Sequence, residues 1–471
     1  MNRRRFIGFT TCAAVTGLSP SAAQSKRSQL VVNDISQLNP VEVAGHSQPR
    51  STNDVRSALR SSRERISIGG ARASMGGQIA APDSLHLDMR RMNQVVRLDA
   101  INRIVRVQAG ARWRDIQDVI DPYDLSIRIM QSYSTFTVGG SVSVNCHGRY
   151  VGRGPIVNSV RAVELVTHDG TVHELTRDRD PELFRAIIGG YGGLGVITEV
   201  ELELDANVRM ERVVEQVNLA DYPSFFHEKI LRNSNVILHN ADLGQPFFDA
   251  PRAVSWVAST KSLTVADRLL ARNLDYDKEQ NAIWAITELP GGDRLQHSLM
   301  ESRLKEQAVV WRNYEASLDI ASLEPRTRLF STYLLQEYFI PTARFFEFAV
   351  GMSRVLRRHG VEALNVSIRH SPADNVSLLK WAPTEVFSFV LYYKQRRSER
   401  ANKEVSVWTR ELIDLALEND GRYYLPYRLD ATRKQFYAAY PEARAFAAIK
   451  SRVDPHNRFD NLLWAKYLRS A

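Results

Sequence analysis

The chain has 471 residues, of which 44% are apolar and 24% charged, and its formal net charge is +9. This length predicts at least two domains with ordinary hydrophobic cores, and no apolar run is long enough to predict a membrane-spanning helix. The basic residues are spread along the chain without a long block, which argues against a nucleic-acid-binding protein. The small excess of basic over acidic residues fits anionic substrates or a peripheral contact with an anionic membrane surface.

Residues 1–24 are predicted to be an export signal. Arg3, Arg4 and Arg5 precede a short apolar stretch and a small-residue end at Ser21-Ala22-Ala23, an order typical of a twin-arginine signal peptide. The alternative is a disordered basic N-terminus. Removal of the signal would lower the net charge from +9 to +6 and leave one of the two cysteines. We therefore expect an exported, periplasmic or cell-envelope protein without an internal disulfide.

Residues 28–206 alternate short strands and helices. Strands are predicted at RISIGG, RIVRVQAGA and VITEVELEL, and helices at WRDIQDVIDPYD and DPELFRAIIGG. Two β-rich runs in VRAVELVTHDGTVHEL, joined at Asp169-Gly170, predict a hairpin.

From about residue 207 glycine becomes scarcer and aromatic residues more frequent. Residues 262–320 read as helix-rich, with a break at Pro290-Gly291-Gly292. STYLLQEYFI and VFSFVLYYK predict buried strands, and RFFEFAVGMSRVLRRHG and SVWTRELIDLALENDG predict amphipathic helices. We expect residues 207–420 to form a second domain and residues 421–471 to return to the first.

Three glycine-rich turns punctuate the first domain: GGARASMGG at 69–77, TVGGSVSVNCHGR at 137–149 and IGGYGGLGVI at 188–197. Glycine lets a ligand approach the bare backbone, and consecutive N–H groups in such turns bind anions. None of the three has the Rossmann or Walker spacing. Together they favour one long, flat, anionic ligand such as a dinucleotide.

In this order the loops, with AGARW, DGTVHEL and LFRAIIGGYGGLGVITEVEL, resemble the FAD-binding domain of the vanillyl-alcohol oxidase superfamily, the PCMH-type domain. LQEYFIP at 335–341 is similar to the cap strand of the sugar-lactone and alditol oxidases. ALNVSIRH and the segment from 421 to 455 are similar to the decaprenylphosphoryl-ribose oxidases. The resemblance implies an α+β fold, in which a two-subdomain FAD-binding domain carries an α+β cap domain with an antiparallel sheet.

The resemblance also implies which residues bind FAD. The flavin contacts expected from it are Gly69, Gly70, Ala71, Arg72, Ala73, Ser74, Gly77, Thr137, Gly139, Gly140, Asn145, Cys146, Gly148, Gly189, Gly190, Val196, Ile197 and Tyr424. Many members bond the flavin to a histidine just before the serine of the first loop, where this chain has Ala73. We therefore expect non-covalent FAD. For Cys146, the alternatives are a covalent flavin ligand and a small buried apolar residue.

Glu337, within LQEYFIP, is the first candidate for the base that takes a proton from a substrate hydroxyl. The alternative is a strand carboxylate that faces solvent. The phosphoribose branch implies that the neighbouring Gln336 holds a substrate hydroxyl, but adjacent strand residues point to opposite faces, so only one of the two faces the flavin. His147, in the second loop, is a catalytic candidate whose alternative is a histidine bonded to the backbone.

Asn365 and Arg369 lie on one side of a predicted strand and are candidate substrate ligands, Arg369 for an anionic group or else in a surface ion pair. Tyr427 and Arg428 stand where the relatives have a lysine or a His-Trp-Gly-Lys stretch, so they are further catalytic candidates. The histidines show no metal-binding spacing, and no metal is expected.

The predicted function is an FAD-dependent oxidoreductase that oxidises a CH–OH group of a sugar-like, polyol or lactone substrate by hydride transfer to flavin N5. Its electron acceptor would be oxygen, a quinone or a carrier protein. Two alternatives stay open, a flavin-binding protein without turnover and a flavin-dependent reductase of C=C bonds.

Overall fold

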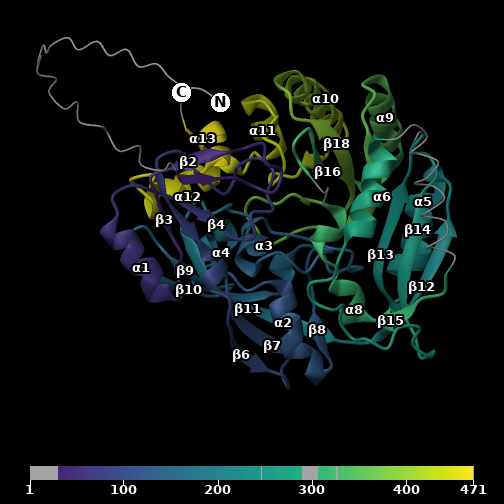
Figure 1. The fold of residues 1–471 in the computed structure, drawn as a ribbon, viewed down its shortest axis with the longest axis horizontal. Coiled ribbons are helices and arrows are strands. Elements are labelled where there is room, and N and C mark those ends of the chain that lie inside the picture. Colours follow the sequence, from purple (N-terminus) through teal and green to yellow (C-terminus); the bar gives the residue numbers. More distant parts are fainter. Residues whose placement is uncertain (1–29, 246, 289–305, 325–326, 470–471) are drawn as a thin grey trace, which may run out of the picture.

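The computed structural model describes residues 30–245, 247–288, 306–324 and 327–469. The predicted signal at 1–24, Cys12 and the Pro290-Gly291-Gly292 break lie outside these ranges. The α+β class is confirmed, because helices and antiparallel sheets are both present (Figure 1). Within the described ranges, no helix combines the length and apolar character needed to cross a bilayer.

The N-terminal part contains two small sheets and one larger sheet. The two-stranded sheet pairs β1 (Leu30–Val32) with β2 (Val41–Val43), and the parallel three-stranded sheet has the order β3 (Gly45–Ser47), β5 (Ser84–Asp88), β4 (Arg65–Gly69). The larger sheet has the order β10 (Val172–Thr176), β9 (Val160–Val166), β11 (Val196–Ala206), β7 (Ile104–Gln108), β6 (Val95–Asp99), and β8 (Leu125–Ile127) also pairs with β11. The predicted hairpin at Asp169-Gly170 is therefore confirmed as β9–β10.

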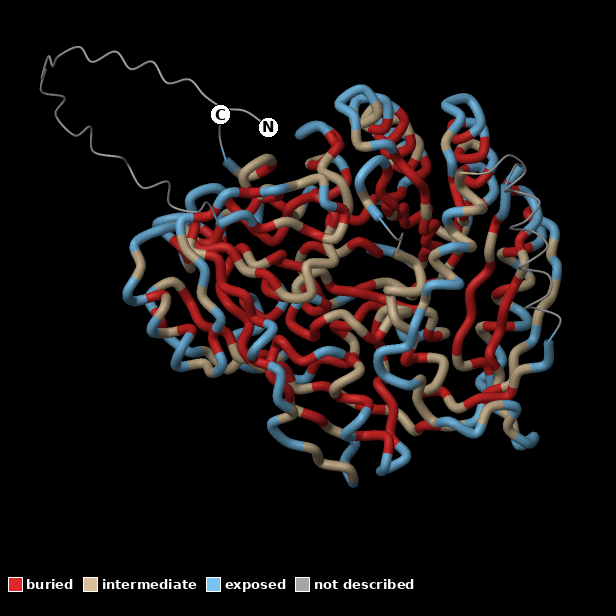
Figure 2. Tube along the Cα trace, in the orientation of Figure 1, coloured by how far each residue is buried: buried red, intermediate tan, exposed pale blue. Residues whose placement is uncertain are grey.

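The cap domain is built on one antiparallel sheet of eight strands. Its order is β15 (Val309–Trp311), β12 (Arg209–Gln216), β14 (Arg252–Ala258), β13 (Val236–Leu243), β17 (Ala363–Ser371), β18 (Val386–Arg396), β16 (Ser331–Pro341), β19 (Arg422–Tyr423). β16 and β18 are buried along nearly their whole length (Figure 2), since both faces of the sheet are covered there. Burial on both faces explains their continuous apolar character.

Helices cover the sheets in both parts. They are α1 (Thr52–Ser61), α2 (Trp113–Ile120), α3 (Val138–Ser143), α4 (Pro181–Ile187), α5 (Tyr222–Phe225), the π-helix η5 (Phe226–Leu231), α6 (Asp277–Glu288), α8 (Arg312–Ala316), α9 (Phe345–Arg358), α10 (Glu399–Glu418), α11 (Arg433–Ala439), α12 (Ala443–Val453) and α13 (Leu462–Tyr467). In α9 the buried residues Phe345, Phe348, Ala349 and Met352 follow helical spacing, so one apolar face packs on the sheet beside α10.

Two expectations about local structure need correction. Residues 262–320 are less helical than predicted, because their described part has α6 and α8 but irregular chain before residue 277 and the edge strand β15. The strands β12, β13 and β14 and the final helix α13 were not predicted.

The C-terminal segment reaches back across the molecule. After β19 joins the cap sheet, α12 and α13 lie beside the N-terminal sheets (Figure 1). The backbone N–H of Ile66 donates to the carbonyl oxygen of Arg458 at 2.6 Å, and the buried Lys450 ammonium donates to the carbonyl oxygen of Gly193 at 2.8 Å. The chain thus passes from the first part to the cap and back, which brings residues 424–427 between the two.

Candidate active site

A large cavity lies where the glycine-rich loops of the N-terminal part face the cap sheet. It holds about 1380 Å³ of space between protein atoms, part of it open to solvent. Its walls come from residues 70–75, 131–147 and 191–197, from cap strands β16, β17 and β18, and from residues 424–427. Two of the three predicted loops therefore meet here directly, together with the edge of the third.

The first loop leaves β4 at Gly69 and lines the cavity from Gly70 to Met75. Arg72 has a φ of 59°, and its guanidinium donates to Asp88 at 3.3 Å, while its buried Nε atom has no hydrogen-bond partner. Burial raises the pKa of Asp88, but hydrogen bonds from Arg90 and the charges of Arg90 and Arg72 outweigh it and hold that pKa well below its usual range. The carboxylate thus keeps its charge and anchors a cationic side chain at the cavity wall.

The second loop runs through α3 and on to His147. Gly139 and Gly140 both line the cavity. A Cβ atom on Gly139 would lie 2.7 Å from the Cβ atom of Ala109, so only glycine lets α3 begin this close to the end of β7. Gly139 thus allows the close packing of α3 on β7, and the backbone of both glycines borders the cavity.

The third loop contributes residues slightly later than expected. Gly189 and Gly190 do not line the cavity, whereas Tyr191, Gly192 and Gly195 do. A Cβ atom on Gly190 would lie 2.5 Å from the carbonyl oxygen of Ala186, so this glycine serves the packing against α4. Gly192 has a φ of 67°, a conformation that favours glycine.

The structure divides the predicted flavin contacts into two sets. Those that line the cavity are Gly70, Ala71, Arg72, Ala73, Ser74, Thr137, Gly139, Gly140, Cys146, Ile197 and Tyr424. Those that do not are Gly69, Gly77, Asn145, Gly148, Gly189, Gly190 and Val196. Lining residues that the sequence reasoning missed include Met75, Gln78, Gln131, Ser132, Tyr133, Tyr191, Gly192 and Gly195. A signal for part of this last set was available in the polar run QSYST at 131–135 and in the later glycines of the third loop.

The residues outside the cavity have structural partners instead. The Asn145 side chain donates to Asp374 at 2.9 Å, and the backbone carbonyl oxygen of Asn145 accepts from the Trp381 indole at 2.8 Å. A Cβ atom on Gly148 would lie 2.0 Å from the carbonyl oxygen of Met130. The N–H of Gly77 donates to the buried Asp34 carboxylate at 2.9 Å. These positions shape the loops and do not face the ligand space.

A buried acid–base pair bridges the two halves of the cavity. Nε2 of His147 lies 2.6 Å from Oε1 of Glu337, and both residues are at most 5% exposed. The His147 ring packs 4.8 Å from Trp381 and 5.6 Å from Phe339, measured between ring centroids. This aromatic packing fixes the imidazole against the carboxylate and restricts water around the pair.

Tyr427 completes this group. Its hydroxyl donates to Oε2 of Glu337 at 3.4 Å. Burial raises the pKa of Tyr427 well above its usual value, and the Glu337 charge adds to the effect. The phenol therefore keeps its proton and can act only as a hydrogen-bond donor or acceptor at neutral pH.

Glu337, and not Gln336, faces the cavity. Side chains alternate along β16, so Leu335 and Glu337 line the cavity while Gln336 points the other way. The Gln336 amide donates to Thr409 of α10 at 2.7 Å and to the Tyr393 hydroxyl at 3.2 Å. The substrate contact expected of Gln336 does not fit this position, because its hydrogen bonds are made on the helix-covered face of the sheet.

Of the three remaining candidate residues, one lines the cavity and two lie outside it. Arg369 lines the cavity, and its buried Nε atom has no hydrogen-bond partner. Asn365 lies outside the cavity and donates to Asp242 at 3.0 Å. Arg428 lies outside it too, because its guanidinium binds Asp430 at 2.8 Å and Asn402 at 2.8 Å. The catalytic role expected of Arg428 and the substrate contact expected of Asn365 therefore do not fit the structure.

Comparison with known proteins identifies the cofactor-binding part. Residues 44–176 match the family described as the FAD binding domain. Two features of the cavity fit that cofactor, namely the bare backbone of its glycine loops and the unpartnered buried polar atoms Arg72 Nε and Ser132 Oγ. The chain therefore contains an FAD-binding domain, and FAD is its cofactor.

Several named relatives extend the similarity. L-Galactono-1,4-lactone dehydrogenase of Arabidopsis thaliana is 28% identical over 249 residues, which cover 48% of this chain and 40% of that protein. L-Gulonolactone oxidase of Bos taurus is 23% identical over 88% of this chain and 92% of its own length. Decaprenylphosphoryl-β-D-ribose oxidase of Mycolicibacterium smegmatis is 24% identical over 83% of this chain and 86% of its own length. The chain spans well under half of the plant dehydrogenases but most of the other two proteins.

Proposed function

Because the chain belongs to the PCMH-type FAD-linked oxidase superfamily, we propose that it is an oxidoreductase acting on a CH–OH group of a sugar-lactone, sugar or polyol substrate. The names of the relatives support a substrate of this class, since they describe oxidases and dehydrogenases of sugar lactones and of a polyprenyl-linked ribose.

The observation that carries the proposal is the buried His147–Glu337 pair, with a contact of 2.6 Å, in the wall of the cofactor cavity. Oxidation of an alcohol carbon requires a group that takes the hydroxyl proton as the carbon loses its hydrogen. A carboxylate paired with an imidazole and sheltered by aromatic rings suits that task. FAD, when bound, supplies the acceptor for the hydride.

The side chains of this cavity have distinct proposed roles. Glu337 accepts the proton of the substrate hydroxyl. His147 orients the Glu337 carboxylate and stabilises its negative charge through their hydrogen bond. The Tyr427 hydroxyl, 3.4 Å from Glu337, holds a substrate oxygen beside the carboxylate. Arg369 reaches the same cavity from β17 and binds an electron-rich oxygen of the substrate, which its unpartnered Nε atom supports.

We further propose that FAD is held without a covalent bond. Ala73 lines the cavity at the position where the resemblance places a linking histidine, and a methyl group cannot form such a bond. Cys146 is the second candidate for a covalent attachment point. Burial raises the pKa of its thiol, which therefore stays protonated and is a poor nucleophile.

The cell compartment and the electron acceptor are proposals as well. The basic, small-residue-terminated segment at 1–24 supports export of the folded chain to the periplasm or cell envelope. Oxygen, a quinone and a carrier protein are the acceptor classes that this location offers.

Anaerobic reduction of the flavin tests the proposal. The FAD-loaded protein is mixed with L-galactono-1,4-lactone, L-gulono-1,4-lactone, alditols and free sugars, and the flavin absorbance is followed. Bleaching by one of these classes is the expected result. A flavin that dithionite reduces but that no member of the panel bleaches would contradict this substrate class and favour the C=C reductase or the flavin protein without turnover.

A further inference from the structure

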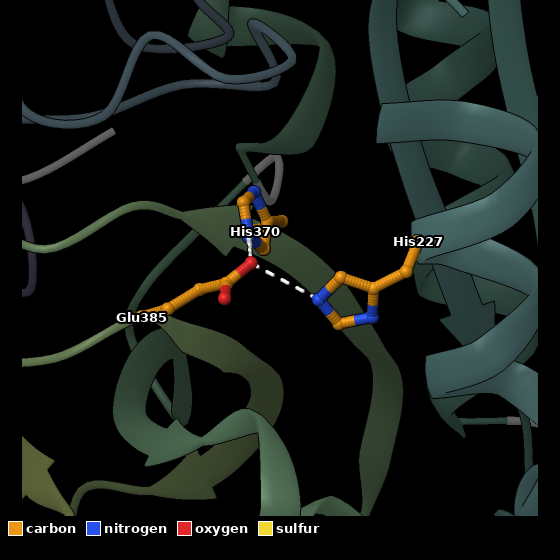
Figure 3. A group of neighbouring side chains, drawn as sticks. All are labelled: His227, His370 and Glu385. Carbon is orange, nitrogen blue, oxygen red and sulfur yellow. Dashed lines mark hydrogen bonds and ion pairs between the residues drawn. The ribbon is translucent and has the colours of Figure 1, made fainter. Parts of the chain in front are cut away.

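Two histidine side chains that do not line the cofactor cavity converge on one carboxylate oxygen, that of Glu385. His227 comes from η5, His370 from the end of β17, and Glu385 from the residue just before β18. Nε2 of His227 lies 3.0 Å and Nε2 of His370 lies 2.7 Å from Oε1 of Glu385 (Figure 3). Among the residues that the structure describes, no other set of three such side chains brings its ligand atoms within 4.8 Å of one another.

The protonation of His227 makes this arrangement unusual. Its Nδ1 atom lies 2.7 Å from the carbonyl oxygen of Pro223, which can only accept a hydrogen bond, so Nδ1 carries the proton. In the neutral imidazole, Nε2 then presents a lone pair to the Glu385 oxygen 3.0 Å away. Two acceptors at this distance repel one another, unless a cation or an extra proton lies between them.

The other two groups supply the remaining ligand atoms. His227, His370 and Glu385 each offer one ligand atom, and these three atoms all lie within 4.8 Å of one another. Imidazole nitrogens and carboxylate oxygens are ligand types that zinc binds in proteins.

We propose that His227, His370 and Glu385 bind a divalent transition-metal ion of the zinc class. Zinc–ligand distances of about 2.0–2.1 Å in tetrahedral geometry place neighbouring ligand atoms about 3.3 Å apart. The contacts of His370 and His227 with Glu385, at 2.7 and 3.0 Å, would therefore open by about 0.6 and about 0.3 Å. The Pro223 carbonyl already holds His227 in the required tautomer, as an outer partner does for metal-bound histidines. The His227 and Glu385 side chains are 35% and 40% exposed, which leaves an entry path and room for water as the fourth ligand.

The ion would act as a clamp within the cap domain. It would tie the helical segment 222–231 to the ends of the neighbouring strands β17 and β18. Chain spacing does not reveal the site, because Glu385 lies 158 residues after His227 and 15 after His370. The expectation of a metal-free protein rested on such spacing.

Zinc titration of the full-length, FAD-loaded chain tests the proposal after treatment with EDTA and dialysis. We expect one equivalent of Zn²⁺ to bind and the melting temperature to rise with the Zn²⁺ concentration, since the ion binds the folded state. The H227Q, H370Q and E385Q variants should each lose this equivalent and the rise in melting temperature. H359Q is the matched control, because it removes another histidine that contacts a glutamate, Glu411 at 2.8 Å, and it should bind Zn²⁺ like the parent.

Two results would overturn the proposal. One is a parent protein that binds no Zn²⁺ in this titration. The other is an equal Zn²⁺ stoichiometry in the parent and the three variants. Should H370Q not fold, H227Q still decides the question, because the His227 side chain is 35% exposed and its replacement disturbs little packing.

Discussion

Nε2 of His147 lies 2.6 Å from Oε1 of Glu337, although the two residues are 190 positions apart in the chain. His147 comes from the second glycine-rich loop and Glu337 from cap strand β16. The pair exists only when the cap is seated on the FAD-binding part. Closure of the fold therefore assembles the proposed acid–base site.

Replacement of Glu337 by glutamine should stop the reductive half-reaction and leave FAD bound. The amide keeps the shape of the side chain but cannot take a proton, and the loss of a general base costs roughly 10²- to 10⁴-fold in rate. Stopped-flow measurement of flavin bleaching under anaerobic conditions gives the rate. The control E347Q removes an exposed carboxylate on α9 and should reduce at the parent rate. A parent-like rate in E337Q would remove Glu337 from the proposed role.

Replacement of Arg72 by glutamine should weaken FAD binding. Arg72 lines the cavity, and hydrogen bonds to charged groups contribute about 1.5–3 kcal/mol, so we expect the Kd for FAD to rise about 10- to 100-fold. Flavin fluorescence during titration of the apoprotein measures this Kd. Arg90 binds the same Asp88 carboxylate but does not line the cavity, so R90Q is the matched control. Equal losses of affinity in the two variants would assign Arg72 a structural role only.

Denaturation should release the flavin from the parent protein. Ala73 lines the cavity and offers no atom for a covalent bond. After acid precipitation or treatment with denaturant, the yellow colour should pass an ultrafiltration membrane that retains the polypeptide. Colour that stays with the polypeptide would contradict non-covalent binding, and C146S and H147Q would then identify the attachment site.

Acidification should destabilise the fold before the carboxylates titrate. Burial lowers the pKa of His239 from 6.5 to about 3, so below pH 6.5 the unfolded chain binds a proton that the folded chain does not. The free energy of unfolding should therefore fall as the pH falls from 6.5 toward 3, by about 1.4 kcal/mol per pH unit for this residue. Above pH 6.5 the contribution is constant.

Urea unfolding at several pH values between 7.5 and 4.5 measures this slope. The H239Q variant loses the hydrogen bonds to Tyr222 and Ser255 and is less stable overall, but its slope should be shallower than that of the parent. The exposed His359 provides the control, because H359Q should keep the parent slope. Identical slopes in all three proteins would show that His239 is not buried in its neutral form.

Local patterns were enough to predict much of the fold. The hairpin at Asp169-Gly170 followed from a turn dipeptide between two β-rich runs, and α9 followed from apolar residues at helical spacing. The strands β12 and β14 were missed, because exposed and half-buried positions in β12 blur the alternation. In β14 four consecutive positions are buried, so it shows no alternation of apolar and polar residues. Residues 262–276 were expected to be helical, yet they form irregular, exposed or half-buried chain.

The sequence by itself determined those features that depend on the chemistry of single residues. Examples are the glycines of the first two loops, the alanine at position 73 and the acidic residue within an aromatic strand. Only the tertiary structure decided that Glu337 faces the cavity while Gln336 contacts α10, and that Arg428 pairs with Asp430 outside it. The two strand residues have equal local reasons to face either way. Helices cover one face of the sheet and the FAD-binding part covers the other. This arrangement determines which of the two side chains faces the cavity.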